Sequence, residues 1–536
     1  MFFLLSILWF ARTAKITLFY LYLWQLKEYQ IKRFLDHFRT EKGKQLILSK
    51  LNFVKVLSIF IFLFHPATFS YLLFILYLAE SFKVLLDISR KRLKKPVLTK
   101  KTTVLISVVI FLEVVFLLNL SVEIGTIFWF PFWLLIVDIL APLIISIIVL
   151  IFQFPTVFLR NQIIKKAKKK REQFGNLLVI GITGSYGKTS TKEFLAAILS
   201  EKFKVLKTKA HQNSEIGISQ CILSELKPEH EIFIVEMGAY GLGGIKLLAD
   251  IVKPKIGILT GINEQHLALF GSQENIVKTK YELIESLPPD GIAIFNGNNK
   301  YCLELYKKTE AFSKKLCNTF SAIAENVLQA NIWAEDIKVE KESVLFRAVS
   351  EDGNSANFKV NLLGGQNVEN ILLAACCAKG LGMNLEEISR ACLRIRPRQG
   401  AMKFLRKDGL IVLDASFSAN PKGVIADLDY LKIYSGKKVI VMPCLIELGK
   451  ASKEVHKKIG RKIAEVCDLA IITTKERFKD IKEGAVENGM KEENILFLKR
   501  PKKNIEKVRE FFGLGDVVLL EGRVPKGMFG LLNSLE

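Results

Sequence analysis

The sequence predicts an α-helical membrane domain followed by two α/β domains, the first of which carries a phosphate-binding loop. Long apolar segments fill the first 150 residues, short apolar strands alternate with helical segments after Arg171, and one strand runs into a glycine loop ending in Gly-Lys-Thr. A chain of 536 residues can hold three units, since domains commonly have about 100 to 200 residues. We expect a polytopic membrane domain over 1–160, a central α/β domain over 173–396 and a C-terminal α/β domain over 397–536.

The charge and the cysteine content indicate the cellular compartment and the class of binding partner. The formal net charge is +24, yet half of the residues are hydrophobic and the basic runs lie beside long apolar stretches. This placement favours membrane lipids with anionic headgroups as partners and predicts no nucleic acid. All eight cysteines follow residue 220 and none has a C-x-x-C spacing, so we expect neither zinc nor disulfides, as in a reduced cytosol.

Three apolar segments are long enough to cross a bilayer, which needs roughly 18 to 20 residues. They are residues 56–79, 103–120 and 127–152. The stretch from Met1 to Trp24 is also apolar, but it contains Arg12 and Lys15 and lacks a small-residue cleavage site, so we interpret it as an uncleaved anchor. Glu113 and Asp138 lie inside apolar runs, where a charged carboxylate needs a partner. They could line a lipid or substrate path, or form hydrogen bonds between helices.

The distribution of lysine and arginine predicts the orientation. The run 165–171 follows the last apolar segment and should be cytoplasmic, whereas the loop 121–126 has no basic residue and should be outside. The basic loop 90–95 then returns to the cytoplasm. Residues 25–50 are basic as well, so a single crossing after them would break the rule. Alternatively, His65-Pro66 makes that segment a hairpin with both ends inside, which we favour because proline interrupts helices.

The most informative motif is a strand, a glycine loop and a helix in direct succession. Residues 177–182 are an apolar strand, residues 183–190 read T-G-S-Y-G-K-T-S, and residues 191–199 have a helical pattern. In this context backbone N–H groups and the helix N-terminus bind phosphate, and the lysine adds charge. The spacing differs from G-x-x-x-x-G-K-[ST], whose first glycine would fall at Ile182. The predicted phosphate ligands are Gly184, Ser185, Gly187, Lys188, Thr189 and Ser190.

The variant T-G-x-x-G-K-T-[ST] resembles the loop of the Mur ligases of peptidoglycan synthesis, and further matches follow in the family's order over residues 175–536. The similarity is greatest to the branch that adds D-alanyl-D-alanine. The matching segments are Asn213–Gly217, Val235–Ala239, Asn263–Leu267, Phe270–Ser272, Lys278–Glu282, Gly364–Asn370, Asp414–Pro421, Ile446–Gly449 with His456, and Gly515–Leu519. The resemblance implies a Mur ligase central domain that binds ATP and a Rossmann-like C-terminal domain.

The resemblance also implies roles for individual residues. The catalytic group would be Lys188, His266 and Lys280. Magnesium would be held by Thr189, Glu236, His266 and Lys280, the last as a carbamate. ATP would further contact Asn367, Asn370, Arg398 and Asp414. The chemistry agrees, because phosphoryl transfer depends on positioning and on neutralising phosphate oxygens, and Mg²⁺ prefers oxygen ligands.

The chain departs from the family at several positions. Gln366 replaces the histidine of G-x-H-N-x-x-N, and Ala415 replaces an aspartate expected near the ribose. Gly400-Ala401 lacks the arginine that contacts ATP phosphate, for which Arg398 could substitute, and Glu521-Gly522-Arg523 stands where Lys-Gly-Ser is usual. Too few residues separate the last apolar segment from the phosphate loop for the family's UDP-sugar-binding domain.

The resemblance implies an ATP-dependent carboxylate–amine ligase that works through an acyl phosphate. Its partners would be an amino acid or dipeptide and a peptide carboxylate, and whether the latter is UDP-linked or lipid-linked stays open. The expected place is the bacterial inner membrane, with several crossings and the catalytic domains in the cytoplasm. The alternatives are a P-loop transport ATPase, which would need a Walker B aspartate, and a catalytically impaired membrane scaffold, which Ala401 and Ala415 favour.

Overall fold

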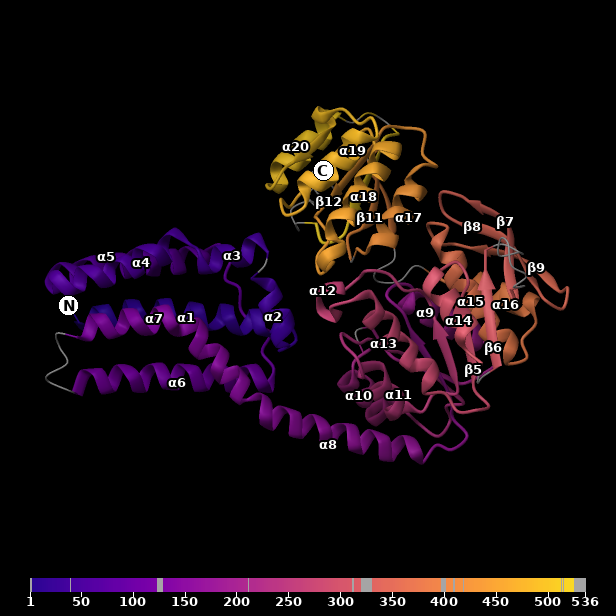
Figure 1. Ribbon diagram of the computed structural model, residues 1–536, viewed down its shortest axis with the longest axis horizontal. Helices are drawn as coiled ribbons and strands as arrows, with labels where there is room; N and C mark the ends of the chain where they lie inside the picture. The colour runs from indigo at the N-terminus through magenta and orange to yellow at the C-terminus, as the bar shows by residue number, and fades with distance from the viewer. Residues whose placement is uncertain are drawn as a thin grey trace. The chain divides into compact units, whose positions relative to one another are not determined.

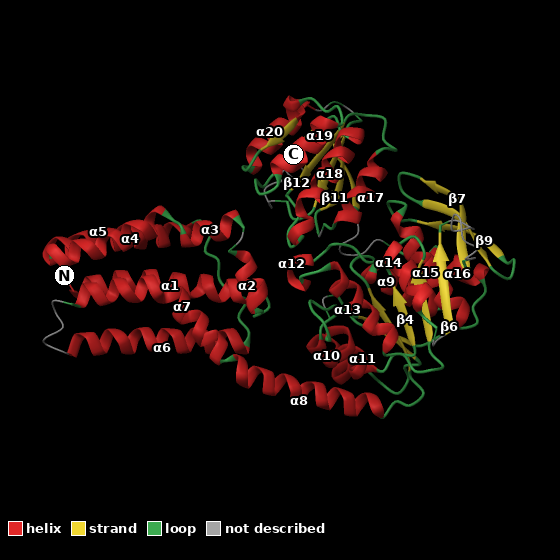
Figure 2. Cartoon of the chain, viewed as in Figure 1, coloured by secondary structure: helices red, strands yellow, loops and turns green. Residues whose placement is uncertain are grey.

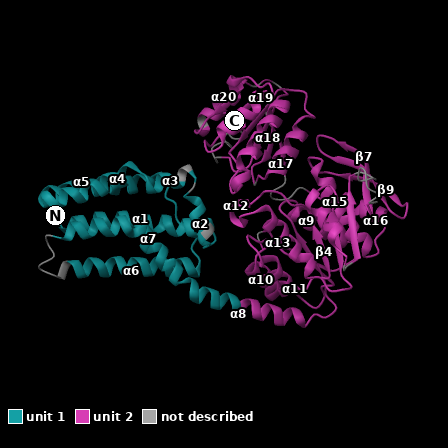
Figure 3. Cartoon of the chain, viewed as in Figure 1, with its two compact units in different colours: residues 1–161 teal, residues 162–536 magenta. Residues whose placement is uncertain are grey.

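The computed structural model describes most of the chain, with short gaps. The described residues are 2–38, 40–122, 129–210, 212–310, 313–319, 330–396, 402–407, 410–417, 419–511, 513 and 515–524. The chain forms two compact units, unit 1 over residues 1–161 and unit 2 over residues 162–536 (Figure 3). The regular elements described in unit 1 are all helices, and the strands lie in unit 2 (Figure 2). A helical part followed by an α/β part agrees with the predicted order of helical and α/β domains.

Unit 1 contains long apolar helices. They are α1 (Phe2–Leu26), α2 (Ile31–His37), α3 (Glu41–Ile47), α4 (Lys50–Phe64), α5 (Pro66–Ser89), α6 (Lys100–Val122) and α7 (Phe130–Ile151), and α8 (Gln153–Glu172) continues into unit 2. Among the described residues, five helical stretches could cross a membrane by length and composition alone. They are residues 2–26, 43–64, 66–89, 100–120 and 130–172. The prediction of one continuous segment over 56–79 is wrong, because α4 ends before His65 and α5 begins at Pro66.

Helices α4 and α5 form an antiparallel hairpin. Phe62 meets Phe69 beside the turn, with ring centroids 5.2 Å apart, and Lys55 reaches Glu80 farther along both helices. Figure 1 shows the two helices side by side. Proline is tolerated in the first turn of α5 because no intrahelical partner exists there for an N–H group. The interruption predicted at His65-Pro66 is therefore confirmed.

The hairpin brings the basic segments of unit 1 to one end of the helices. Helix α1 runs parallel to α7, because Trp9 Nε1 donates to Leu134 O (2.7 Å) and Trp24 Nε1 donates to Ser146 Oγ (3.1 Å), and α6 runs the opposite way (Figure 1). The described basic residues at this end are Lys27, Arg33, Lys44, Lys50, Arg90, Lys91, Arg92, Lys94, Lys95, Lys100 and Lys101. The described residues at the other end carry no Lys or Arg, as expected for a hairpin with both ends on one side.

Four charged side chains meet inside unit 1 and form the bundle cluster of Arg12, Lys55, Glu80 and Asp138. The Lys55 side chain is 2% exposed and forms ion pairs with Glu80, at 2.7 Å, and with Asp138. Arg12 Nε lies 2.8 Å from the Glu80 carboxylate. Glu113 accepts a hydrogen bond from α1 at 3.1 Å. Asp138 and Glu113 therefore connect helices, which favours the second of the two interpretations considered for them.

Unit 2 begins with a nine-stranded sheet. Its strands are β1 (Leu178–Thr183), β2 (Val205–Lys207), β3 (Ile232–Glu236), β4 (Ile256–Leu259), β5 (Ile292–Asn296), β6 (Ser313–Asn318), β7 (Ile332–Val339), β8 (Val344–Ser350) and β9 (Ser355–Val360). The order is β2-β3-β1-β4-β5-β6-β7-β8-β9. The pairs from β2 to β7 are parallel, and β7-β8-β9 are antiparallel. Parallel pairing places the carboxyl ends of β1 and β3 together, where the phosphate loop begins.

Helices cover both faces of this sheet, so its central strands are apolar throughout. One face packs against α9 (Lys188–Leu199), α15 (Gln366–Gly380) and α16 (Leu385–Cys392). The other packs against α10 (Glu215–Glu225), α11 (Gly244–Val252), α13 (Gln273–Glu285) and α14 (Lys300–Lys308), and the short α12 (Leu267–Phe270) precedes α13. The result is the three-layer α/β architecture that the alternating pattern predicted.

The end of α8 belongs to this core. Ile164 and Ala167 are buried in it, and the Arg171 guanidinium donates to the carbonyl of Val252 at 3.0 Å. Lys170 Nζ donates to a backbone carbonyl of α10 at 3.0 Å. The basic run 165–171, interpreted from sequence as an orientation signal beside the membrane, therefore also has a structural role in unit 2.

The C-terminal part of unit 2 has a second sheet. Its strands are β10 (Lys403–Lys407), β11 (Leu410–Ala415), β12 (Lys438–Met442), β13 (Leu469–Ile472), β14 (Ile495–Phe497) and β15 (Val517–Glu521), in the order β10-β11-β15-β12-β13-β14. All pairs are parallel except β10 with β11. Its helices are α17 (Pro421–Leu431), α18 (Ser452–Val466), α19 (Phe478–Glu487) and α20 (Pro501–Phe511), with the 3-10 turns η2 (Gly449–Ala451) and η3 (Glu492–Asn494). Helices on both sides of a parallel sheet match the Rossmann-like prediction.

Candidate active site

The phosphate loop joins β1 to α9. Gly184 and Gly187 have φ values of 155° and 78°. A Cβ at Gly187 would lie 2.4 Å from the side-chain oxygen of Asn370, so the position has neither the backbone angle nor the space for another residue. Lys188 Nζ donates to Gly184 O at 2.7 Å and to Ser185 O at 3.3 Å. The loop thus curls around its own lysine at the N-terminus of α9, as phosphate binding requires.

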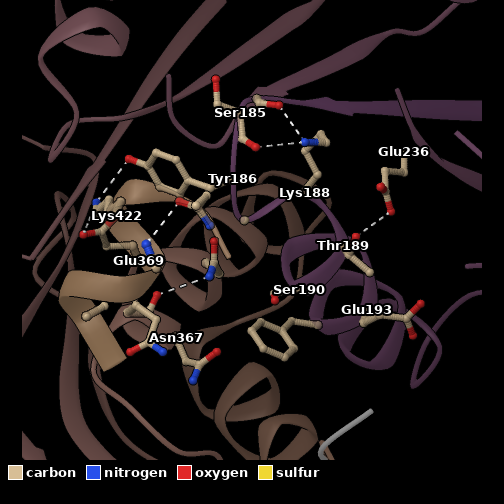
Figure 4. Close-up of a pocket in the computed structure, with 18 of the residues that line it drawn as sticks. Ser185, Tyr186, Lys188, Thr189, Ser190, Glu193, Glu236, Asn367, Glu369 and Lys422 are labelled. Atoms are coloured by element: carbon tan, nitrogen blue, oxygen red, sulfur yellow. Dashed lines mark hydrogen bonds and ion pairs between the residues drawn. The ribbon is translucent and has the colours of Figure 1, made fainter. Parts of the chain in front are cut away.

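Glu236 lies at the end of β3, beside the start of α9 (Figure 4). Its Oε2 accepts hydrogen bonds from Thr189 Oγ1 (3.0 Å) and Lys192 Nζ (3.1 Å), and its Oε1 accepts one from Asn213 Nδ2 (3.1 Å). Burial alone would raise the pKa of Glu236, but Lys192 and Lys188 hold it below its usual value. Glu236 therefore stays a carboxylate next to the Thr189 hydroxyl, and together they offer the oxygen ligands that Mg²⁺ prefers.

Lys192 is a site residue that the sequence interpretation missed. Its side chain is fully buried, one turn after Lys188 on α9, and it contacts Glu236 rather than the cavity. The i, i+4 spacing to Lys188 was a usable signal, because it places both ammonium groups on one face of the helix.

Lys280 is buried on α13 without an anionic partner. Its side chain is 4% exposed, and within the described residues it makes no hydrogen bond or ion pair. Its Nζ lies 5.7 Å from the ring centroid of Phe270. Burial, reinforced by the charge of Lys188, lowers the pKa of Lys280 to about 7. Glu282 acts in the opposite direction, but its carboxylate is bound to backbone N–H groups at the start of α11.

His266 links the central domain to the C-terminal domain. Its Nδ1 lies 2.5 Å from the carboxylate of Glu447, and Ala268 N donates to Glu447 O at 3.0 Å. His266 and Glu447 both have a φ of 65°, a conformation that non-glycine residues rarely adopt and that is often found at functional sites. The Tyr240 ring stands edge-on to His266, with centroids 5.2 Å apart. The predicted histidine therefore lies in the site but is engaged with Glu447.

The two asparagines predicted to face adenine lie at the start of α15. Asn367 Nδ2 donates to Leu363 O (2.9 Å), and Asn370 Oδ1 accepts from Thr191 Oγ1 (3.2 Å). Asp414 Oδ1 accepts from the backbone N–H of Ser416, so it stabilises the turn after β11. Arg398, proposed from sequence as a substitute for the missing arginine, lies outside the described residues. Gln366, in place of the family's histidine, donates to Asp427 at 3.1 Å.

These groups line one cavity of about 570 Å³. Of the site residues predicted from the sequence, those that line the cavity are Gly184, Ser185, Gly187, Lys188, Thr189, Ser190, Glu236, His266, Lys280, Asn367 and Asn370. The C-terminal domain contributes Ala415, Phe417, Asn420, Lys422, Gly423, Ala426 and Asp427. No three His, Cys, Asp or Glu side chains gather as a metal site in the parts of the chain that the structure covers. An Mg²⁺ site here would therefore also need oxygens from the nucleotide or from a modified lysine.

Comparison with known proteins identifies the domains. Residues 182–378 match the Mur ligase middle domain, and residues 402–524 match the Mur ligase glutamate ligase domain. The chain belongs to the Mur ligase family. The loop, Glu236, His266 and Lys280 fall within the first of these domains, and Glu447 and Lys422 within the second.

Relatives and solved structures agree with this assignment. The chain is 32% identical over 294 residues to UDP-N-acetylmuramoyl-tripeptide–D-alanyl-D-alanine ligase of Synechocystis, which covers 55% of this chain and 60% of that protein. It therefore spans about three fifths of that relative. It is similar to MurF from Acinetobacter baumannii (TM-score 0.62, 25% identity, covering 70% of this chain and 80% of that one). It also shares the fold of MurF ligase from Thermotoga maritima in complex with ADP (TM-score 0.60, 24% identity, 70% and 83% covered).

Proposed function

We propose that this protein is an ATP-dependent ligase of peptidoglycan precursor synthesis that joins a peptide carboxylate to the amine of an amino acid or dipeptide. The observation that carries the proposal is that the phosphate loop, Glu236 and Lys280, which has no anionic partner among the described residues, line one cavity. Relatives named for D-alanyl-D-alanine addition make that dipeptide the first amine to test. A transport ATPase or an inactive scaffold would not need a buried lysine with a lowered pKa beside the phosphate loop.

The reaction proceeds in two steps. A carboxylate oxygen attacks the γ-phosphorus of ATP, the bond to the β-phosphate oxygen breaks, and ADP leaves. The amine then attacks the acyl carbon, a C–N bond forms, and phosphate leaves while the amine loses a proton. Lys188 and the N–H groups at the start of α9 neutralise phosphate charge, which is the main form of catalysis available to phosphoryl transfer.

A magnesium ion and Lys280 complete the proposed mechanism. Thr189 and Glu236 fit an Mg²⁺ ion, which when bound would neutralise charge on the phosphate oxygens. Lys280, with a pKa of about 7, has much of its amine in the neutral form at physiological pH. A neutral amine can add to CO₂, forming an N–C bond and releasing a proton, which yields a carbamate anion. We propose this modification because it would turn an unpaired buried cation into an oxygen ligand.

We further propose that the helices of unit 1 cross the bacterial inner membrane and that the catalytic domains lie in the cytoplasm. The apolar helices and the basic residues gathered at one end of them support this orientation. Anionic membrane lipids would contact the basic end. A ligase held at this surface would meet a lipid-linked peptide at a raised effective concentration. We therefore propose a substrate presented at the membrane in preference to a soluble UDP-linked one.

The test offers purified full-length protein the same peptide on a UDP-sugar and on a polyprenyl-linked sugar, each with Mg²⁺, ATP and D-alanyl-D-alanine. ADP release that depends on both peptide and dipeptide is the expected result, with a higher kcat/KM for the lipid form. The comparison protein should begin at Gln162 so that Ile164, Ala167 and Arg171 stay in the core. No ADP release with any acceptor would reject the ligase. Equal use of the UDP form by both proteins would reject the lipid-linked substrate.

A further inference from the structure

A lysine of the C-terminal domain is tied to the central domain at the nucleotide side of the cavity. Lys422 is in the first turn of α17, and its Nζ lies 2.9 Å from Oε1 and 2.7 Å from Oε2 of Glu369. Glu369 is in the first turn of α15, between the asparagines predicted to face adenine. Its side chain is 15% exposed, and that of Lys422 is 34% exposed. This ion pair is therefore partly shielded from solvent and lies where the nucleotide is expected.

The same lysine contacts the phosphate loop. Its Nζ lies 3.2 Å from the hydroxyl of Tyr186 and 4.8 Å from the centre of the Tyr186 ring (Figure 4). Tyr186 is the residue between Ser185 and Gly187, and its hydroxyl also accepts from Asn299 Nδ2 at 3.2 Å. Lys422 thus joins two elements that would hold opposite ends of a nucleotide.

The number of N–H donors on Lys422 indicates which groups it can bind. A lysine ammonium has three N–H donors. Lys422 has three acceptors within hydrogen-bond distance, the two oxygens of Glu369 and the hydroxyl of Tyr186. The number of acceptors thus matches the number of donors, in contrast to Lys188, whose partners in the described residues are backbone carbonyls of its own loop. In this structure Lys422 therefore connects α17 to α15 and to the phosphate loop, and we do not assign it as a phosphate ligand.

A second contact also joins α15 to α17. Gln366, also in the first turn of α15, donates to Asp427 on α17 at 3.1 Å. The first turn of α15 is therefore held to α17 at two points. The chain has Ala401 after Gly400, where the resemblance led us to expect an arginine reaching ATP from the C-terminal domain. Contacts between the domains themselves, from Gln366 to Asp427 and from Lys422 to Glu369, hold α15 to α17 without such an arginine.

We propose that Lys422 is a positioning residue, which with Glu369 and Tyr186 forms a clamp that holds the C-terminal domain closed over the nucleotide. The proposal rests on the proposed function in that ATP is the ligand enclosed. The clamp stabilises the closed arrangement in which both domains line the cavity, so it strengthens nucleotide binding without contacting phosphate. It also couples the shape of the phosphate loop to domain closure through Tyr186.

The first test measures the affinity of the full-length protein for ADP with Mg²⁺ by equilibrium binding. Lys422→Met and Glu369→Gln should each weaken binding by about tenfold, the size expected for losing hydrogen bonds to a charged group. The double variant should be little weaker than Lys422→Met alone, because that change already removes the pair. Exchanging the charges, Lys422→Glu with Glu369→Lys, should restore part of the affinity; the recovery is partial because Glu369 also accepts from Asn296 Nδ2 at 2.9 Å and that bond is lost. Tyr186→Phe should have a smaller effect, and Lys432→Met, a partly exposed lysine after α17, should have none.

Several outcomes would overturn the clamp. If Lys422→Met weakens ADP binding while Glu369→Gln does not, Lys422 acts on the nucleotide itself. Wild-type affinity in both variants, or no recovery on exchanging the charges, would also reject it. A zero-length carbodiimide crosslink between Lys422 and Glu369, identified by mass spectrometry without nucleotide, tests the pair separately. An absent crosslink would reject the contact and with it the clamp, whereas a crosslink in a protein that, untreated, binds no ADP would keep the contact between the domains but reject both the nucleotide and the proposed function.

Discussion

Two buried lysines, one in each unit, have nearly the same exposure and opposite surroundings. Lys55 of the bundle cluster is 2% exposed and contacts the carboxylates of Glu80 and Asp138. Lys280 beside the phosphate loop is 4% exposed and has no carboxylate partner among the described residues. Removing a charge from water is costly unless it is paired, so the same burial has different consequences at the two places.

The difference indicates what each lysine does. A lysine whose partners all come from the protein connects elements of the fold, and the bundle cluster connects α1, α4, α5 and α7. A lysine buried without a partner is costly to the fold and is retained where a ligand or a modification completes it. Lys422 belongs with the first kind, although it lies in the cavity, because its three donors are all used.

The largest expected effect is at the phosphate loop. Lys188→Ala should lower ATP turnover by about 10³-fold, because one preorganised charge on the transferring phosphoryl group is lost. The fold should persist, since the Nζ of Lys188 bonds only to carbonyls of its own loop. ADP release and thermal unfolding would be measured together, with Lys253→Ala, an exposed lysine, as the control. Near-normal turnover would reject the phosphate-loop assignment.

Substitutions in the bundle cluster should lower the stability of unit 1. Lys55→Met leaves two buried carboxylates with Arg12 as the remaining cation of the cluster, so unit 1 should lose about 3 to 5 kcal/mol of unfolding free energy. Adding Asp138→Asn removes one carboxylate and should recover most of this loss, because the pair of Arg12 with Glu80 remains. Unfolding in detergent would be followed, with the exposed Lys83→Met as the matched control. A double variant as unstable as Lys55→Met would show that the charges are not coupled.

Substitution of Lys280 should lower the ligase activity. If it is carbamylated, Lys280→Ala should lower ligase activity by about 10- to 100-fold, comparable to losing a group that supports a metal site. A small added carboxylate should restore part of it by replacing the missing anion. Lys253→Ala, treated identically, controls for an effect of the carboxylate on the assay. Full activity of Lys280→Ala, or no rescue at any carboxylate concentration, would contradict the modification.

The smallest effect is the pH dependence of stability without CO₂. The pKa of Lys280 is about 7 in the folded protein against an ordinary value of 10.5. Between these values the unfolded state binds a proton that the folded state does not, so the unfolding free energy rises with pH. The slope from this group is at most about 1.4 kcal/mol per pH unit. Thermal unfolding in CO₂-free buffer should show the rise in the wild type relative to Lys280→Met. Parallel curves for the two proteins would mean an ordinary pKa.

Local patterns were sufficient for much of the fold. The strand, loop and helix at residues 178–199 are adjacent in sequence, and the periodicity of their apolar residues follows from which face is buried. The apolar runs of unit 1 and the break at Pro66 are equally local, since a proline lacks the N–H that a continuous helix would use. The ordered matches to the Mur ligases placed Glu236, His266 and Lys280 around one cavity although they are far apart in the chain.

Other features depended on contacts that no local pattern contains. The sequence by itself determined the α/β class, the phosphate loop and the apolar helices, because backbone angles and burial leave a periodic record along the chain. Only the tertiary structure decided that Lys55 has carboxylate partners whereas Lys280 has none among the residues that the structure describes. It also decided that Glu447 engages His266 and that Lys422 reaches Glu369 and Tyr186. The physical reason is that the cost of a buried charge depends on which side chains lie within a few ångströms, and these come from distant segments.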